Sequence, residues 1–291
     1  MGIPAQKTNS VDGLDYSVID VTTQDEIDSF RKYMIESKGH SLPAHEFMLE
    51  FRPDVIKTFR NWVQKIPSEE SRAKPLPRTM AMVHYYAITG YEDGIDYEIR
   101  LSQFHGATKN EVLDLLAIAA LHGHTRGTRS VAISSTDYMR SYPTPPAKER
   151  WPGNWSFDRD AFRTGIDYAS QDATREEIDR ILGWYRSALG EIPSHISMLA
   201  EFRPRMLKAY RIRYETAIQA ELPQQMMPYL LLHWNTIMGF KEGIRENVLL
   251  GLHLGMTKPQ ITEAIFNSIY ATPENLSIVD EAAGEILRKL E

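Results

Sequence analysis

Apolar positions recur at helical spacing along most of the chain. Spacings of three and four residues place such side chains on one face of an α-helix. One such stripe comprises Val112, Leu115, Leu116, Ala119 and Ala120, and another comprises Ile261, Ala264, Ile265 and Ile269. No segment shows the sustained apolar–polar alternation or the hairpin signal that indicates strands. The pattern therefore predicts an all-α fold, with about six helices in each half of the chain and little or no sheet.

Several helix starts are marked by capping boxes, in which a hydroxyl and a carboxylate satisfy free N–H groups of the first turn. The motif occurs at Thr23–Glu26, Thr108–Glu111 and Thr174–Glu177, and in a weaker form at Thr257–Gln260. Proline is tolerated at the first position of a helix, so another helix is expected to begin at Pro53.

The second half of the chain repeats motifs of the first half in the same order. The recurring pairs include Gly13–Tyr16 and Gly165–Tyr168, Leu42–His45 and Ile192–His195, Phe51–Pro53 and Phe202–Pro204, His84 and His233, and Gly106–Lys109 and Gly255–Lys258. The offset drifts only from 152 (165 − 13) to 149 (233 − 84). We interpret this as a tandem duplication, which predicts two helical units in a pseudo-symmetric arrangement.

A proline-rich segment separates the two copies. Residues 141–154 contain four prolines and one glycine, which rules out a continuous helix. The expected organisation is a first unit at 1–140, an extended linker at 141–158 and a second unit at 159–291.

The composition restricts the compartment and the partners. The chain has no cysteine and a formal charge of −6, which argues against disulfides, thiol chemistry and binding of nucleic acid. No apolar run approaches the roughly 20 residues of a membrane helix, and Met1–Lys7 shows no secretory signal. These features predict a cytoplasmic protein with neither membrane nor nucleic acid as a partner.

The stretch Leu76–Val112 resembles the central helical hairpin of the carboxymuconolactone decarboxylase and alkylhydroperoxidase D-like superfamily. There, two helices end in a Gly-x-[ST]-x-x-Glu motif, which Gly106–Glu111 matches, and Phe51–Pro53 resembles the family's helix start. The likeness covers roughly residues 45–130 and 195–280. It implies a decarboxylase-like lyase that needs no cofactor and acts on a small carboxylated lactone, keto acid or metabolite of aromatic catabolism. It also implies a homo-oligomer, a trimer of two-unit chains.

The peroxidase branch of that family carries a Cys-x-x-Cys-x-x-x-His motif on the second helix, and this chain departs from it. The three positions hold Tyr91, Gly94 and Glu98 in unit one, and Phe240, Gly243 and Asn247 in unit two. A cysteine-dependent peroxidase is therefore excluded. Arg78 matches the arginine that follows Leu-Pro in the decarboxylases.

Two sets of residues are candidates for catalysis. Glu98 and His105 share one helical face at a spacing of seven residues, so they could form an acid–base pair. A solvated or intersubunit salt bridge is the alternative. His84 lies in an apolar helix and is expected to be neutral, as is its counterpart His233. His84 and the hydroxyl of Tyr85 could stabilise an oxyanion, and a core histidine with one backbone hydrogen bond is the alternative.

Other residues are candidates for substrate binding. Arg78 could hold a carboxylate in a two-pronged way. His122 and His124 follow the third helix of the family pattern, at the turn that borders the family's pocket. A further group could wall that pocket, namely Tyr91, His233 and Trp234. Two histidines without a third ligand do not predict a metal site, and no nucleotide-binding motif is present.

Two other classes of function stay open at this point. The chain could be a non-catalytic helical scaffold or a small-molecule binding protein. It could also catalyse an isomerase or hydrolase reaction in the same pocket. A pocket filled by side chains between the His84 and Glu98 helices would favour the scaffold.

Overall fold

The structure is a computed structural model that describes residues 10–218, 221–270 and 272–290, so Met1–Lys7 lies outside the described residues. The described residues form fourteen α-helices, one 3-10 helix and no strand. The all-α prediction is confirmed. Each half holds seven α-helices, one more than the sequence suggests.

The same order of helices occurs twice along the chain. The first half contains α1 (Gln24–Lys38), α2 (Pro43–Phe51), α3 (Pro53–Val63), α4 (Glu69–Ala73), α5 (Leu76–Thr89), α6 (Glu92–Phe104) and α7 (Lys109–Arg140). The second half contains α8 (Arg175–Leu189), α9 (Ser194–Phe202), α10 (Pro204–Ala217), α11 (Met226–Met238), α12 (Lys241–His253), α13 (Lys258–Ser268), the 3-10 helix η1 (Pro273–Asn275) and α14 (Leu276–Lys289). Helix α4 has no counterpart in the second half, and α7 corresponds to α13 and α14 together, because the offset of 149 relates both ends (258 − 109 and 289 − 140).

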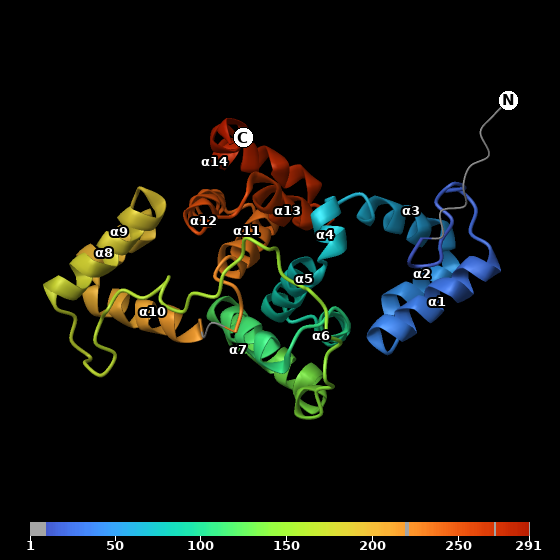
Figure 1. Cartoon of the computed structure of the whole chain (residues 1–291), viewed down its shortest axis with the longest axis horizontal. Helices are drawn as coiled ribbons and strands as arrows, with labels where there is room; N and C mark the ends of the chain where they lie inside the picture. Colours follow the sequence, from blue (N-terminus) through green and yellow to red (C-terminus); the bar gives the residue numbers. More distant parts are fainter. Residues whose placement is uncertain (1–9, 219–220, 271, 291) are drawn as a thin grey trace.

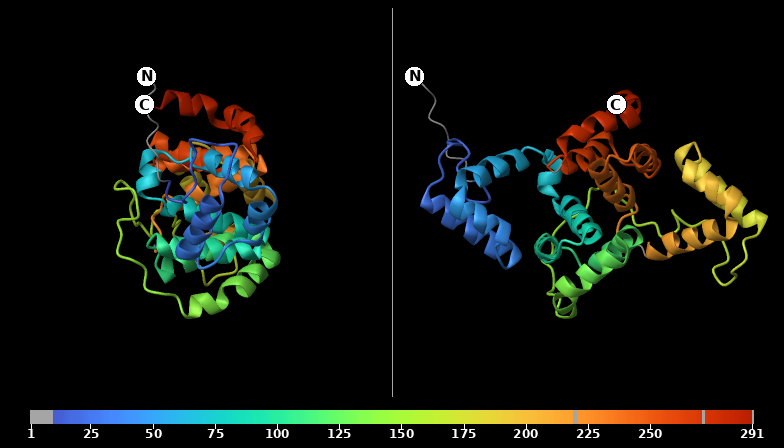
Figure 2. Two further views of the ribbon diagram at one scale, coloured as in Figure 1. Left: turned by 90° about the vertical axis from the view of Figure 1, so that its right-hand side faces the viewer. Right: turned by 180° about the vertical axis from the view of Figure 1, so that it is seen from behind.

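The helices form a central bundle with an arm on either side (Figures 1 and 2). The bundle consists of α4–α7 and α11–α14. The first arm, α1–α3, packs on α6 through α1, and the second arm, α8–α10, packs on α12 through α8. Helix α10 of the second arm also contacts α7, which belongs to the first half of the chain.

The predicted helix starts are present. Thr23, Thr108, Thr174 and Thr257 all form complete capping boxes, and Pro53 begins α3. These local signals work because each satisfies N–H groups that the first turn leaves without a partner.

Matching buried ion pairs close the two arms. Lys57 on α3 lies 2.6 Å from the capping carboxylate of Glu26, and Lys208 on α10 lies 2.8 Å from that of Glu177. Each lysine also donates to a backbone carbonyl of the segment before the first helix. These shared contacts support the tandem duplication, and the pseudo-symmetric arrangement of the two units stays a prediction.

Side chains of the linker form hydrogen bonds with both units. The indole N–H of Trp151 donates to the capping carboxylate of Glu111 at 3.1 Å, and that of Trp155 donates to Gln260 at 3.0 Å. The two indoles stack with their ring centroids 6.0 Å apart. The linker therefore holds the first turn of α7 and the first turn of α13 together.

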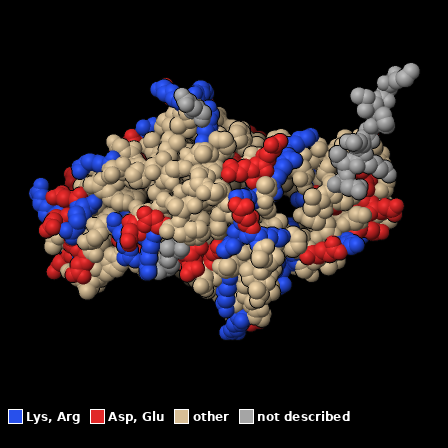
Figure 3. All heavy atoms as spheres, viewed as in Figure 1, with Lys and Arg blue, Asp and Glu red and all other residues tan. Residues whose placement is uncertain are grey.

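Acidic and basic side chains are interspersed on the face that Figure 3 shows. Among the residues that the structure describes, none of the helices combines the length and the apolar character that a membrane crossing requires.

The hydrogen bond of Trp155 gives a test of the linker. Trp155→Phe keeps the aromatic ring and removes the N–H donor to Gln260. We expect the free energy of unfolding, measured by urea denaturation, to fall by about 1 kcal/mol. Trp62→Phe is the matched control, because Trp62 is 44% exposed. An equal effect of both substitutions would contradict the role of the linker.

Exposed apolar side chains on the two arms test the predicted oligomer. Phe51 and Phe202, at equivalent positions, are 58% and 59% exposed. We expect light scattering after size exclusion to give the mass of a trimer. We expect Phe51→Glu combined with Phe202→Glu to lower that mass, because a contact between copies would bury these rings. A monomeric wild-type chain would contradict the prediction.

Candidate active site

A cavity of about 450 Å³ lies among the second arm, α11, α12 and α7. Its lining includes three residues that the sequence singles out, His122, His124 and Trp234. Its volume is in the range of small-molecule sites. The other lining residues are Leu121, Trp184, Tyr185, Leu189, His195, Tyr210, Arg213, Tyr214, Leu231, Asn235, Phe240, Gly243, Glu246, Asn247 and Leu250.

Aromatic rings form much of the cavity wall. The six that line it are Trp184, Tyr185, Tyr210, Tyr214, Trp234 and Phe240. A buried cation supports this wall, since the guanidinium of Arg211 lies 4.0 Å from the ring centroid of Trp184. Arg211 is neutralised by Glu215 at 2.9 Å, so its charge is already compensated.

Glu246 is the ionisable acid of the cavity. It makes no hydrogen bond or ion pair with any described residue. Burial raises the pKa of its carboxyl to about 7, aided by the negative charges of Glu242 and Glu191 and opposed by Arg211. A carboxyl that titrates near neutral pH can both give and take a proton.

Three tyrosines line the same cavity as this carboxylate and lie within range of its charge. Burial raises the pKa values of Tyr185, Tyr210 and Tyr214, and in each case the charge of Glu246 adds to the effect. All three tyrosines are therefore neutral phenols that face a single acid.

Three other polar side chains of the cavity are neutral. Asn247 donates from Nδ2 to the carbonyl of Gly243 at 2.8 Å, and its buried Oδ1 has no hydrogen-bond partner among the described residues. Burial lowers the pKa of His122 to about 4 and also lowers that of His195. Both imidazoles are therefore uncharged at neutral pH and can donate or accept a hydrogen bond.

A kink in α7 forms one side of the cavity. His124 has φ 51° and ψ −158°, and it is the one described non-glycine residue with a positive φ. The predicted end of the third helix is present at His124, where the backbone leaves the helical conformation before a further helical segment continues to Arg140. His122 lies in the last turn before this break and not after it.

Neighbouring contacts stabilise the kink. The guanidinium of Arg213 on α10 donates to the carbonyls of Ala120 and Leu121, which lie just before the bend. On the other side, α7 packs closely on α5, where a Cβ at Gly127 would lie 2.3 Å from the carbonyl oxygen of Ala87. Only glycine permits that approach.

Several predicted site residues meet where α5 contacts α11. The rings of His84 and His122 lie 6.2 Å apart, and Tyr85 lies 6.2 Å from both His233 and Trp234. The structure thus brings these five residues together beside the cavity.

The two equivalent histidines are fully buried here. Burial lowers the pKa of His84 far below its usual range, with His122 and His233 adding to the effect. Burial also lowers the pKa of His233 to about 3, although the nearby backbone of Asn267 opposes this. No ring nitrogen of either histidine has a hydrogen bond of normal geometry. Both are therefore neutral. The backbone of Asn267 is the hydrogen-bond partner that His233 approaches, whereas His84 has no such partner among the described residues.

Glu98 lies apart from these residues, in the part of unit one that corresponds to the cavity. The offset that pairs His84 with His233 (233 − 84 = 149) pairs Tyr97 with Glu246 (246 − 97 = 149). Tyr97 is buried, and the ammonium of Lys38 lies 3.4 Å from its ring centroid. Burial raises the pKa of Glu98, opposed by Lys38.

The remaining predicted residues are also apart from the cavity lining. His105 ends α6, and burial lowers its pKa to about 3, aided by Lys148 and Arg78. No hydrogen bond joins His105 to Glu98 among the described residues. Burial lowers the pKa of Arg78, although Glu263 and Glu98 oppose this. Tyr91 is 37% exposed and packs on Tyr86.

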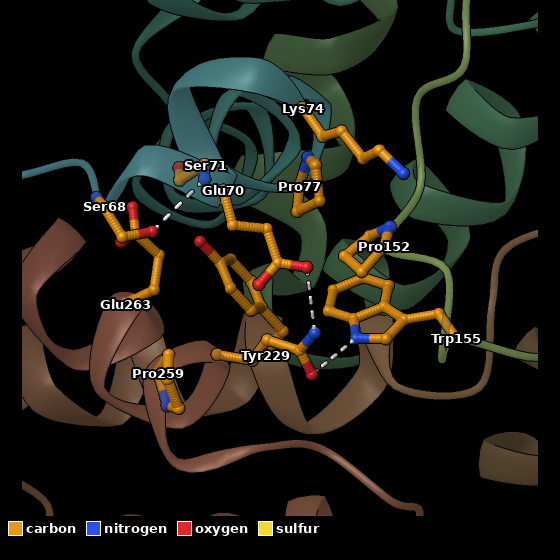
Figure 4. Close-up of a pocket in the computed structure, with 11 residues that line it drawn as sticks. Ser68, Glu70, Ser71, Lys74, Pro77, Pro152, Trp155, Tyr229, Pro259 and Glu263 are labelled. Atoms are coloured by element: carbon orange, nitrogen blue, oxygen red, sulfur yellow. Dashed lines mark hydrogen bonds between the residues drawn. The ribbon is translucent and has the colours of Figure 1, made fainter.

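A second, much smaller cavity of about 20 Å³ lies between α4 and α13 (Figure 4). It is large enough for one water molecule and too small for a substrate. The hydroxyl of Tyr229 and Oε1 of Glu263 line it and are buried without hydrogen-bond partners. We assign it a structural role.

A search of protein-family models, curated proteins and solved structures finds no match to this chain. The resemblance to the carboxymuconolactone decarboxylase family therefore stays a prediction.

Sequence reasoning missed the acid of the cavity. Glu246 corresponds to a tyrosine in unit one, so the repeat gave no indication of it. His195 could have been selected as a candidate from the sequence, because it is the counterpart of His45 in the repeat. The aromatic wall could not be predicted from the sequence. Its rings lie on α8, α10, α11 and at the start of α12, and these helices meet only in the folded structure.

The raised pKa of Glu246 predicts how stability depends on pH. Its carboxyl has an ordinary pKa of 4.5 when unfolded and about 7 when folded, so the folded state binds more protons between these values. The contribution of Glu246 to stability therefore falls as the pH rises from 4.5 to about 7 and is constant above that range. Glu246→Gln should remove this fall and raise stability at pH about 8 relative to the wild type. Parallel urea curves of the two proteins over this pH range would contradict it.

Proposed function

We propose that the chain is a cofactor-independent lyase that works by acid–base catalysis in the cavity of the second unit. The observation that carries the proposal is a carboxylate, Glu246, placed without a partner in an aromatic-walled cavity of about 450 Å³. Glu246 would transfer the proton. The substrate would be a small molecule with a largely aromatic or apolar surface, because such a surface matches the wall.

The neutral groups around Glu246 support this chemistry. Bond cleavage next to a carbonyl builds negative charge on oxygen, and a hydrogen-bond donor lowers the energy of that charge. His122 and His195 are neutral imidazoles that can supply such a donor. Within the described residues, no group of three potential ligands is placed to bind a metal ion, so the proposal uses side chains alone.

A decarboxylation would need a cation for the substrate carboxylate as well. Arg78, the residue expected to hold it, is not part of the cavity lining. Arg213 is at the cavity, but it donates to two backbone carbonyls. The cavity therefore supports proton transfer more strongly than it supports recognition of a carboxylate, and the lactone or keto-acid substrate rests on the family resemblance alone.

A small-molecule binding protein is the second candidate. The observation that favours it is the aromatic wall of the cavity, which can hold a ligand by contact alone. A binding protein would use the cavity in the second unit without turning over its ligand.

Activity screening of a matched pair of variants separates the two candidates. The wild type is tested against carboxylated lactones, β-keto acids and small aromatic metabolites, with product formation followed by mass spectrometry. Glu246→Gln, which keeps the shape of the side chain, should lower kcat for any substrate found by about 10²-fold or more. Glu285→Gln, on the exposed surface of α14, should leave it unchanged.

Two results would argue against the enzyme. A Glu246→Gln protein with full turnover would remove Glu246 from the mechanism. Tight binding of a compound that both proteins leave intact would favour the binding protein.

A further inference from the structure

The cavity presents hydrogen-bond acceptors that lack donors. Oδ1 of Asn247 is buried in the cavity lining without a hydrogen-bond donor. The Nδ2 of the same side chain donates to the carbonyl of Gly243. The carboxylate of Glu246 likewise has no partner among the described residues. Buried acceptors of this kind are normally satisfied by water or by a ligand that donates. A ligand that fits must therefore bring donors.

The charges around the cavity favour a cation. The negative charges of Glu242, on the same helix, and of Glu191, after α8, add to that of Glu246. The cation behind the wall, Arg211, is neutralised by Glu215. The other cation, Arg213, is at the exposed rim and is bound to the carbonyls before the kink.

No other charged group at the cavity opposes a cation. His122 and His195 have lowered pKa values and are neutral at neutral pH. The tyrosines that face Glu246 are neutral as well. The interior is therefore left with one uncompensated negative charge, that of Glu246 in its ionised form.

The wall favours a cation for a separate reason. Aromatic faces carry a negative quadrupole and attract cations within about 6 Å. Trp184, Tyr185, Tyr210 and Tyr214 line one side, and Trp234 and Phe240 complete the wall from α11 and the start of α12. A ring of aromatic faces around one carboxylate suits an ammonium group with an apolar body.

We infer that the ligand of this cavity is a small protonated amine with an aromatic or apolar body, held by Glu246 and Asn247 within the aromatic wall. The inference rests on the proposed function, because it names the class of molecule that the same site accepts. A primary or secondary ammonium fits better than a quaternary one, since only the former can donate to Oδ1 of Asn247.

Calorimetric titration of the full chain with three probes of nearly equal shape tests the inference. The probes are 2-phenylethylamine, which is a cation, 2-phenylethanol, which is neutral, and phenylacetate, which is an anion. We expect the amine to bind at least about tenfold more tightly than the other two at pH about 8, since a charge-assisted hydrogen bond is stronger than a neutral one. We expect its affinity to rise between pH 6 and 8, because Glu246 becomes ionised near pH 7 while the amine stays protonated.

Variants locate the binding site. Glu246→Gln and Asn247→Leu should each remove most of the preference for the amine, and Glu285→Gln on the surface should keep it. Circular dichroism checks that each variant is folded. The pH dependence of the wild type provides a second test if a variant does not fold.

Three results would overturn the inference. They are phenylacetate binding as tightly as the amine, an amine preference that Glu246→Gln leaves intact, and an absence of amine binding at millimolar concentration. The first would leave the proposed acid–base site standing with a different substrate. By contrast, full turnover in Glu246→Gln would remove the proposed function without bearing on which probe binds.

Discussion

The candidate site depends on one half-buried carboxylate that has no counter-charge. Glu246 lies where the second arm covers α12, and the nearest buried cation, Arg211, is already paired with Glu215. Removing a carboxylate from water without compensation favours its neutral form, which explains why its pKa is raised. The polar chemistry of the cavity follows from this, because the neighbouring imidazoles and phenols are neutral and cannot stabilise the ionised acid by charge. Such an acid destabilises the fold at neutral pH, and a cost of this kind is typical of a functional site.

The two halves of the chain have diverged at this position. Where unit two has Glu246 and an open cavity, unit one has Tyr97, with Lys38 over its ring and Glu98 beside it. The capping boxes and the buried lysine pairs of the arms are shared by both halves. After a duplication, contacts that close the fold are under the same physical constraint in both copies, whereas only one copy needs to keep a site.

The sequence predicted the parts of the structure that depend on local interactions. The helix periodicity, the caps such as Thr23 and the break at 141–158 all involve residues close together in the chain, and all are found. The cavity depends on long-range packing, so it could not be predicted. His122 and His124 were correctly linked to a pocket, but the bend at His124 depends on tertiary contacts that involve Arg213 and Gly127. The proposed pair of Glu98 and His105 shares a helical face, yet periodicity alone does not show what covers that face.

The central claim is that the carboxyl of Glu246 is half-buried in a site without a counter-charge and titrates near neutral pH. Carbon-13 NMR of the protein labelled at the glutamate side-chain carboxyls measures this directly, with Glu246→Gln used to assign the resonance. The account predicts a midpoint of about 7 for that one carboxyl. A midpoint near the ordinary value of 4.5 would show a solvated or paired carboxylate and would contradict the account.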